Sequence, residues 1–189
     1  EKSTTPLLLH TEIGQKLEDI VFWTNQRSVN MFAEGLLRQI GATTYGIGTY
    51  DNGERVLDSL FLKWQLGPCG IVDGSGLSKV NRMSAAQFVK LLGQQSNTPY
   101  FSTYFKSLPI AGQTGTVKNL CKGQAGEGRV HAKSGSIQGI KAYAGYVESA
   151  SGHQIAFTII ANEYRISGAA IAKKMEPFLN SLATYQAQP

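Results

Sequence analysis

The 189-residue chain has little charge, little cysteine and no long apolar run. Charged residues make up 16% of it, and no apolar stretch approaches the roughly 18 residues that a membrane-spanning helix needs. The formal net charge is +5, but lysine and arginine are scattered singly and Lys173-Lys174 is the longest basic run. A basic stripe of the kind that binds nucleic acid is therefore missing, and we expect no nucleic-acid partner.

Cysteine and histidine give no metal-binding pattern. Cys69 and Cys121 lack metal-ligand spacing. They can pair in an oxidising compartment, although two free or buried thiols are favoured. Among the histidines, His131 alternates with Lys133 along a predicted strand and could therefore approach a site on that face. We expect neither a metal nor a cofactor.

The hydrophobic periodicity predicts an α+β fold, and the length suits one domain over residues 1–189. Helices are expected over 16–26, 30–40, 52–65, 84–94, 99–107 and 167–185. Strands are expected over 5–10, 129–134, 140–148 and 153–162, with the last two joined as a hairpin. Gly41 is expected to end the second helix, and Pro177 to kink or divide the last.

Lys133-Ser134-Gly135 ends one predicted strand and is the first candidate for chemistry. The ammonium supplies positive field where a carboxylate could dock, and the Ser134 hydroxyl can donate to that carboxylate. Gly135 has no Cβ, so a substrate backbone could lie flat against the strand. Alone, the tripeptide is better explained as a glycine-containing strand with a solvated lysine.

Ser28-Val29-Asn30 precedes an amphipathic helix about a hundred residues earlier. Taken alone, Ser28 and Asn30 are better explained as helix caps. However, a Ser-x-Asn motif followed by a Lys-Ser-Gly strand end is an ordered pair found in serine enzymes that bind penicillin. A third stretch, 73–84, is a Gly/Ser loop that leads into a helix with a capping box at Ser84 and Gln87.

Together these stretches resemble a known family. The phrases at 28–37, 73–78, 108–116 and 128–139 are similar to the penicillin-binding D-alanyl-D-alanine carboxypeptidases/endopeptidases of the class C, DacB-like group, and the similarity runs from about Leu7 to about Leu182. The resemblance implies a penicillin-binding/β-lactamase-like transpeptidase fold, with an antiparallel sheet flanked by helices. It also implies hydrolysis of peptidoglycan stem peptides that end in D-Ala-D-Ala through an acyl-enzyme, acylation by β-lactams, and a periplasmic or cell-envelope location.

The resemblance assigns catalytic roles to three residues. Ser28 would relay a proton to the departing D-alanine. Asn30 would hold the peptide carbonyl of the substrate and the lysine of the nucleophile motif. Lys133 would provide the field that keeps this second lysine neutral enough to act as a base.

It also assigns a substrate-binding strand end. Ser134 and Ser136 would donate to the terminal carboxylate, and Gly135 would let the peptide approach. The backbone N–H of Ser136 would form half of the oxyanion hole.

The family nucleophile lies in a Ser-x-x-Lys motif, and this chain has none. No serine has lysine three residues later, and the single threonine match, Thr103 with Lys106, falls in an aromatic segment expected to be a short helix. We therefore expect the nucleophile helix to lie outside this chain. Residues 1–189 would then be the C-terminal portion of one transpeptidase-like domain, inactive alone and partnered by the N-terminal remainder of the same protein. The alternative is a non-catalytic peptidoglycan- or peptide-binding module that keeps the cleft and lacks the nucleophile.

Overall fold

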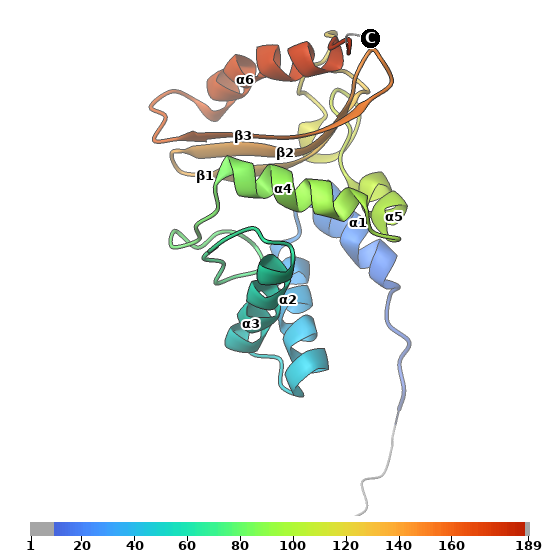
Figure 1. Cartoon of the computed structure of the whole chain (residues 1–189), viewed down its shortest axis with the longest axis vertical. Coiled ribbons are helices and arrows are strands. Elements are labelled where there is room, and N and C mark those ends of the chain that lie inside the picture. The colour runs from blue at the N-terminus through green and yellow to red at the C-terminus, as the bar shows by residue number, and fades with distance from the viewer. Residues whose placement is uncertain (1–9, 188–189) are drawn as a thin grey trace, which may run out of the picture.

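Five helices precede three strands and a closing helix in the residues that the structure, a computed structural model, describes (10–187). The helices are α1 (Leu17–Arg27), α2 (Asn30–Tyr45), α3 (Tyr50–Lys63), α4 (Ala85–Ser96), α5 (Phe101–Ser107) and α6 (Gly168–Ala183). A short 3-10 turn, η1 (Gly115–Val117), precedes strands β1 (Val130–Ile137), β2 (Ile140–Glu148) and β3 (Gln154–Asn162). Figure 1 shows α6 on one side of the sheet and α4 on the other.

The three strands form an antiparallel sheet in the order β1-β2-β3. Beyond the outer edge of β1, the segment before η1 continues the backbone pairing. The Ala111 N–H donates to the Val130 carbonyl at 2.9 Å, and the Ala132 N–H donates to the Pro109 carbonyl at 2.9 Å. The predicted α+β class and the hairpin between β2 and β3 are confirmed.

Alternation along the strands creates two apolar layers. Val130, Ala132 and Val147 face α6 and pack with its Met175 and Leu179. The opposite face carries Tyr146, which packs with Leu92 of α4, Leu108 and the aromatic side chains of α5. The Tyr146 hydroxyl donates to the Leu92 carbonyl at 2.9 Å, so the buried phenol is satisfied. Lys133 lies on this second face by the same alternation.

Helices α2 and α3 pack against each other away from the sheet (Figure 1). A Cβ added at Gly41 would lie 2.8 Å from the Gly53 nitrogen, and one added at Gly53 would lie 2.5 Å from the Leu37 carbonyl oxygen. The two glycines therefore allow a close helix contact. The prediction that Gly41 ends α2 is wrong, because α2 continues to Tyr45 and Gly46, with φ of +81°, caps it.

Other helices and strands begin or end within a few residues of the predicted positions. The helices expected over 16–26, 52–65 and 84–94 are confirmed, the one expected from 99 begins at Phe101, and β1 runs to Ile137 rather than Ser134. Pro177 does not divide α6, which is continuous from Gly168 to Ala183. The strand expected over 5–10 lies outside the described residues except for His10, which is not in a strand. Within residues 10–187, no helix combines the length and apolar character that crossing a bilayer requires.

Candidate active site

Ser28 lies in the tight connection between α1 and α2 and adopts a left-handed backbone conformation, with φ of 55°. The N-cap of α2 is Val29, and no side chain caps that end. The capping explanation for Ser28 is therefore excluded, and its hydroxyl is available for another partner. A serine in this conformation is uncommon and costs backbone energy, which is often a mark of a functional site.

Two hydrogen bonds hold the last turn of α1, and with it Ser28, in place. The Asn25 side-chain amide donates to the Ser107 hydroxyl at 2.7 Å. The buried Gln26 amide donates to the Ser107 carbonyl at 3.1 Å. Because Ser107 ends α5, which packs on the sheet, these bonds fix the position of Ser28 relative to β1.

Lys133 projects from β1 to this connection. Its ammonium donates to the Ser28 hydroxyl oxygen at 2.9 Å and to the Ser134 carbonyl at 2.7 Å. Burial lowers the pKa of Lys133, and the nearby Lys141 cation lowers it further. An ammonium has donors only, so Ser28 accepts from Lys133 and its own hydrogen is free to be donated elsewhere.

Asn30, the third predicted catalytic residue, is exposed at the first position of α2. One residue, Val29, separates it from Ser28. Ser28 of the Ser-x-Asn motif therefore contacts the ammonium of Lys133, and Asn30 begins the helix two residues later.

The three predicted substrate-binding residues lie at the open end of β1. The Ser134 hydroxyl donates to the Thr116 hydroxyl at 2.8 Å, while Gly135 and Ser136 are exposed. A Cβ at Gly135 would meet only the Ala142 Cβ, at an ordinary 3.7 Å. Packing within the described residues therefore does not require glycine there, and any steric requirement must come from something that binds over the strand.

A cleft of about 910 Å³ lies between this strand end and the 71–84 loop, and Gly135 and Ser136 help to line it. Asp73 organises the loop. Although burial opposes it, hydrogen bonds to the carboxylate lower the pKa of Asp73, and the donors are Asn81, Ser78, Gly76 and Ser75. Asp73 is thus stabilised as an anion that holds the loop in shape.

Glu34 attaches this loop to α2. Its carboxylate accepts from the Gly74 N–H at 2.9 Å and from the Ser75 N–H at 3.2 Å. A Cβ at Gly74 would collide with the Ala33 carbonyl, so the loop backbone lies directly on the helix. The phrases at 28–37 and 73–78 contain Glu34 and Gly74, respectively. The contact between α2 and the loop was nevertheless not predicted from them.

His131 and Cys121 are surrounded by packed side chains, whereas Cys69 is only partly buried. The His131 ring stacks on Phe105 with centroids 4.3 Å apart, and burial lowers its pKa despite the opposing field of Glu148. Cys69 and Cys121 are both free thiols, and burial raises the pKa of Cys121 to about 12. In residues 10–187, no group of three or more His, Cys, Asp or Glu side chains is placed to hold a metal ion.

Thr116 is another residue of this site that the sequence motifs did not indicate. It lies in the stretch 108–116, which carries part of the family resemblance, but nothing in the local pattern links it to Ser134. Their hydrogen bond joins residues 18 positions apart across two chain segments.

Comparison with known proteins identifies the family. The model of the D-Ala-D-Ala carboxypeptidase 3 (S13) family matches residues 1–185. The chain belongs to this family. It is 36% identical over 185 residues to a D-alanyl-D-alanine carboxypeptidase of Actinomadura sp. (strain R39), covering 94% of this chain and 34% of that protein. It is 25% identical over 181 residues to D-alanyl-D-alanine carboxypeptidase DacB of Haemophilus influenzae, covering 91% of this chain and 37% of that protein.

Solved structures agree on the fold. Penicillin binding protein 4 (dacB) of Haemophilus influenzae superposes with a TM-score of 0.80 at 23% identity, over 88% of this chain and 40% of that one. A class A β-lactamase of Bacteroides cellulosilyticus gives a TM-score of 0.63 at 21% identity, over 87% of this chain and 64% of that one. The penicillin-binding/β-lactamase-like fold is therefore confirmed. The chain spans about a third of the length of these curated relatives.

Proposed function

We propose that residues 1–189 are the C-terminal portion of one transpeptidase-like domain in a serine-type D-Ala-D-Ala carboxypeptidase/endopeptidase. The whole protein would cleave peptidoglycan stem peptides in the periplasm or cell envelope and would be acylated by β-lactams. The nucleophile would come from the N-terminal remainder of the protein. The hydrogen bond between Lys133 and Ser28 is the observation that carries this proposal.

In the proposed reaction, a serine outside this chain attacks the carbonyl between the two D-alanines. The carbon–nitrogen bond breaks, the departing amine takes a proton, and water later hydrolyses the ester. Ser28 accepts a hydrogen bond from Lys133, so its own hydrogen points away from the ammonium and can be donated to the departing nitrogen. Asn30 would hold the peptide carbonyl of the substrate and the lysine of the nucleophile motif.

The end of β1 would hold the peptide itself. The Ser136 N–H would supply half of the oxyanion hole. The hydroxyls of Ser134 and Ser136 would donate to the terminal carboxylate, and Ser134 would turn to it from its present partner, Thr116. The exposed Gly135, which no internal packing requires, is consistent with a peptide that lies over this strand.

The test uses the longer protein and measures D-alanine released from a peptide that ends in D-Ala-D-Ala. Ser28→Ala should lower the rate by about 100-fold, the scale of a positioned proton donor. Ser59→Ala, at an exposed position of α3, is the control and should keep the wild-type rate. A longer protein that binds the peptide without releasing D-alanine would favour the non-catalytic module instead.

A further inference from the structure

Ser107 is a buried polar residue to which the proposed reaction gives no role. It ends α5, and only 2% of it is exposed. Its hydroxyl donates to the Tyr104 carbonyl at 2.6 Å and accepts from the Asn25 side-chain amide at 2.7 Å. Its carbonyl accepts from the Gln26 side-chain amide at 3.1 Å. A single residue of α5 therefore binds two side chains from the last turn of α1.

The same residue leads directly into the segment that pairs with β1. Two residues after Ser107, the carbonyl of the buried Pro109 accepts from the Ala132 N–H at 2.9 Å. Ala132 immediately precedes Lys133, whose ammonium donates to the Ser28 hydroxyl. The contacts thus form a closed ring, which runs from Ser28 back along α1 to Ser107, on to β1, and through the Lys133 side chain to Ser28 again.

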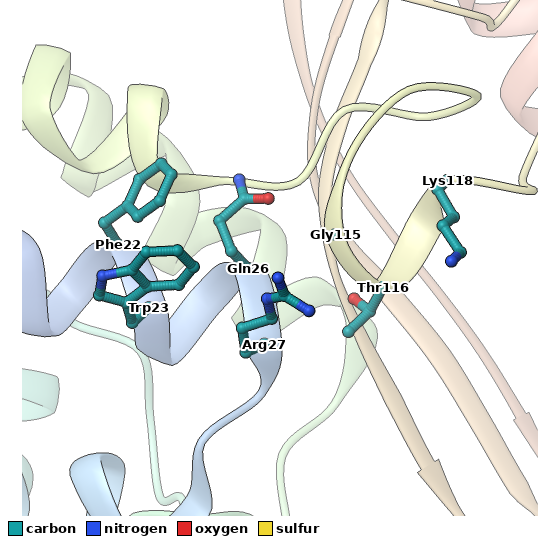
Figure 2. Close-up of a pocket in the computed structure, with 7 residues that line it drawn as sticks. All are labelled: Phe22, Trp23, Gln26, Arg27, Gly115, Thr116 and Lys118. Atoms are coloured by element: carbon teal, nitrogen blue, oxygen red, sulfur yellow. The ribbon is translucent and has the colours of Figure 1, made fainter.

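A backbone contact limits how far the end of α1 can move within this ring. A Cβ at Gly115, which has φ of 56°, would lie 2.7 Å from the side-chain oxygen of Gln26 and 2.9 Å from its carbonyl oxygen. Figure 2 shows the Gln26 side chain between α1 and the segment that carries Gly115. Only glycine allows this approach. Gln26 is therefore bonded to Ser107 and packed against the backbone at Gly115.

The connection that carries Ser28 has little local support of its own. Ser28 adopts a left-handed conformation that is disfavoured for a residue with a Cβ. The N-cap residue of α2, Val29, makes no side-chain capping bond, so the hydrogen bond that commonly fixes the start of a helix is missing there. The position of the Ser28 hydroxyl therefore depends on the contacts that hold α1.

We propose that Asn25 and Ser107 are positioning residues of the reaction, because their hydrogen bond sets the distance between the Ser28 hydroxyl and the Lys133 ammonium. The inference rests on the proposed function for the step that this distance serves. In that step Ser28 donates its hydrogen to the departing nitrogen, and such a transfer depends steeply on geometry. Neither Asn25 nor Ser107 lines the cleft at the end of β1. Loss of their bond should therefore slow the chemistry and leave the affinity for the ligand unchanged.

The kinetic experiment uses the longer protein and benzylpenicillin. Asn25→Leu keeps the size of the side chain and removes the donor, and Ser107→Ala removes the hydroxyl while leaving the carbonyl that Gln26 binds. Saturation kinetics separate the first-order acylation rate constant from the apparent dissociation constant. Each variant should lower the rate constant about tenfold, less than the roughly 100-fold cost of a misplacement by one ångström, with an unchanged dissociation constant. Ser102→Ala, at an exposed position of α5, is the control and should keep the wild-type rate constant.

The double variant, Asn25→Leu with Ser107→Ala, tests whether the two residues act through one bond. It should be about as slow as either single variant, because both substitutions remove the same interaction. Effects that multiply to about 100-fold would overturn the inference. A merely structural role would lower the fraction of molecules that become acylated and leave the rate constant of the acylated molecules at the wild-type value, which would overturn it as well.

Crystal structures of the longer protein and of its Asn25→Leu variant test the geometry without a reaction. The Ser28 hydroxyl should lie within hydrogen-bond distance of the Lys133 ammonium in the wild type and beyond it in the variant. An unchanged contact in the variant would overturn the inference. A wild-type protein that benzylpenicillin does not acylate would count against the proposed function instead, and the two structures would still decide the inference.

Discussion

The Lys133 ammonium lies 2.9 Å from the Ser28 hydroxyl oxygen and joins two residues 105 positions apart. This contact exists because the end of α1 is anchored to Ser107 and because β1 presents Lys133 on the face that α5 covers. The donor is a half-buried ammonium whose pKa is lowered by burial. The ammonium is thus partly removed from solvent, while the Ser28 end of the contact is exposed.

Replacing Lys133 by alanine in the longer protein should lower the rate of acylation by a β-lactam at least ~100-fold, because the proposed proton network and carboxylate site lose their shared cation. The free energy of unfolding should change much less, because Lys133 is only partly buried within β1 and one of the two partners of its ammonium is an exposed hydroxyl. Stopped-flow acylation kinetics and urea unfolding measure the two effects. Lys106→Ala, exposed on α5, is the control. Wild-type acylation by Lys133→Ala would show that the motif has been assigned wrongly.

The left-handed conformation of Ser28 predicts that glycine at this position gives a more stable protein than alanine does. Ser28→Gly should be more stable than Ser28→Ala by up to about 1 kcal/mol, because glycine adopts φ of 55° without a Cβ clash. The same pair of substitutions at Ser102, inside α5, should give the opposite order by about 0.5–1 kcal/mol. Urea unfolding of the four variants compares them. If glycine is the less stable choice at both positions, Ser28 is not strained.

The lowered pKa of His131 predicts that the free energy of unfolding depends on pH. Burial lowers its pKa below the ordinary 6.5, so the folded protein holds the neutral ring while the unfolded chain takes up a proton below that pH. The contribution of the neutral ring is therefore complete above pH 6.5 and is lost as the pH falls through the lowered folded-state pKa. His131→Phe keeps the stacking on Phe105 and cannot titrate, so it should lose less stability than the wild type between pH 7.5 and pH 5. Identical losses would contradict the burial argument.

Much of the fold could be predicted from local patterns. The spacing of apolar residues predicted the helices, and the alternation of apolar and polar residues predicted β2 and β3. Both patterns arise because one face of each element is buried. Gly41 was misinterpreted because a glycine late in a helix is consistent with either a cap or a close contact. The contact with Gly53 of α3 that decides between them depends on another helix.

The candidate site residues could be predicted from the sequence motifs, but the hydrogen bonds between them could not. The motifs indicated Ser28 and Lys133, and their order gave the family resemblance. Their hydrogen bond, the anchoring by Asn25 and Gln26, and the link from Ser134 to Thr116 all join segments distant in sequence, so no spacing within one motif reveals them. For His131, alternation along the strand correctly predicted that it shares a face with Lys133. Its stacking on Phe105 of α5 could not be predicted, because Phe105 lies in a different element.

In the proposed function, Ser28 and Lys133 serve a nucleophile that lies outside residues 1–189. Mass spectrometry after incubation with benzylpenicillin, followed by peptide mapping, tests it most directly. The longer protein should carry one acyl group, on the serine of a Ser-x-x-Lys motif upstream of Glu1, and chain 1–189 alone should carry none. A stoichiometric adduct on isolated chain 1–189, or an adduct of the longer protein that maps within these residues, would contradict the account.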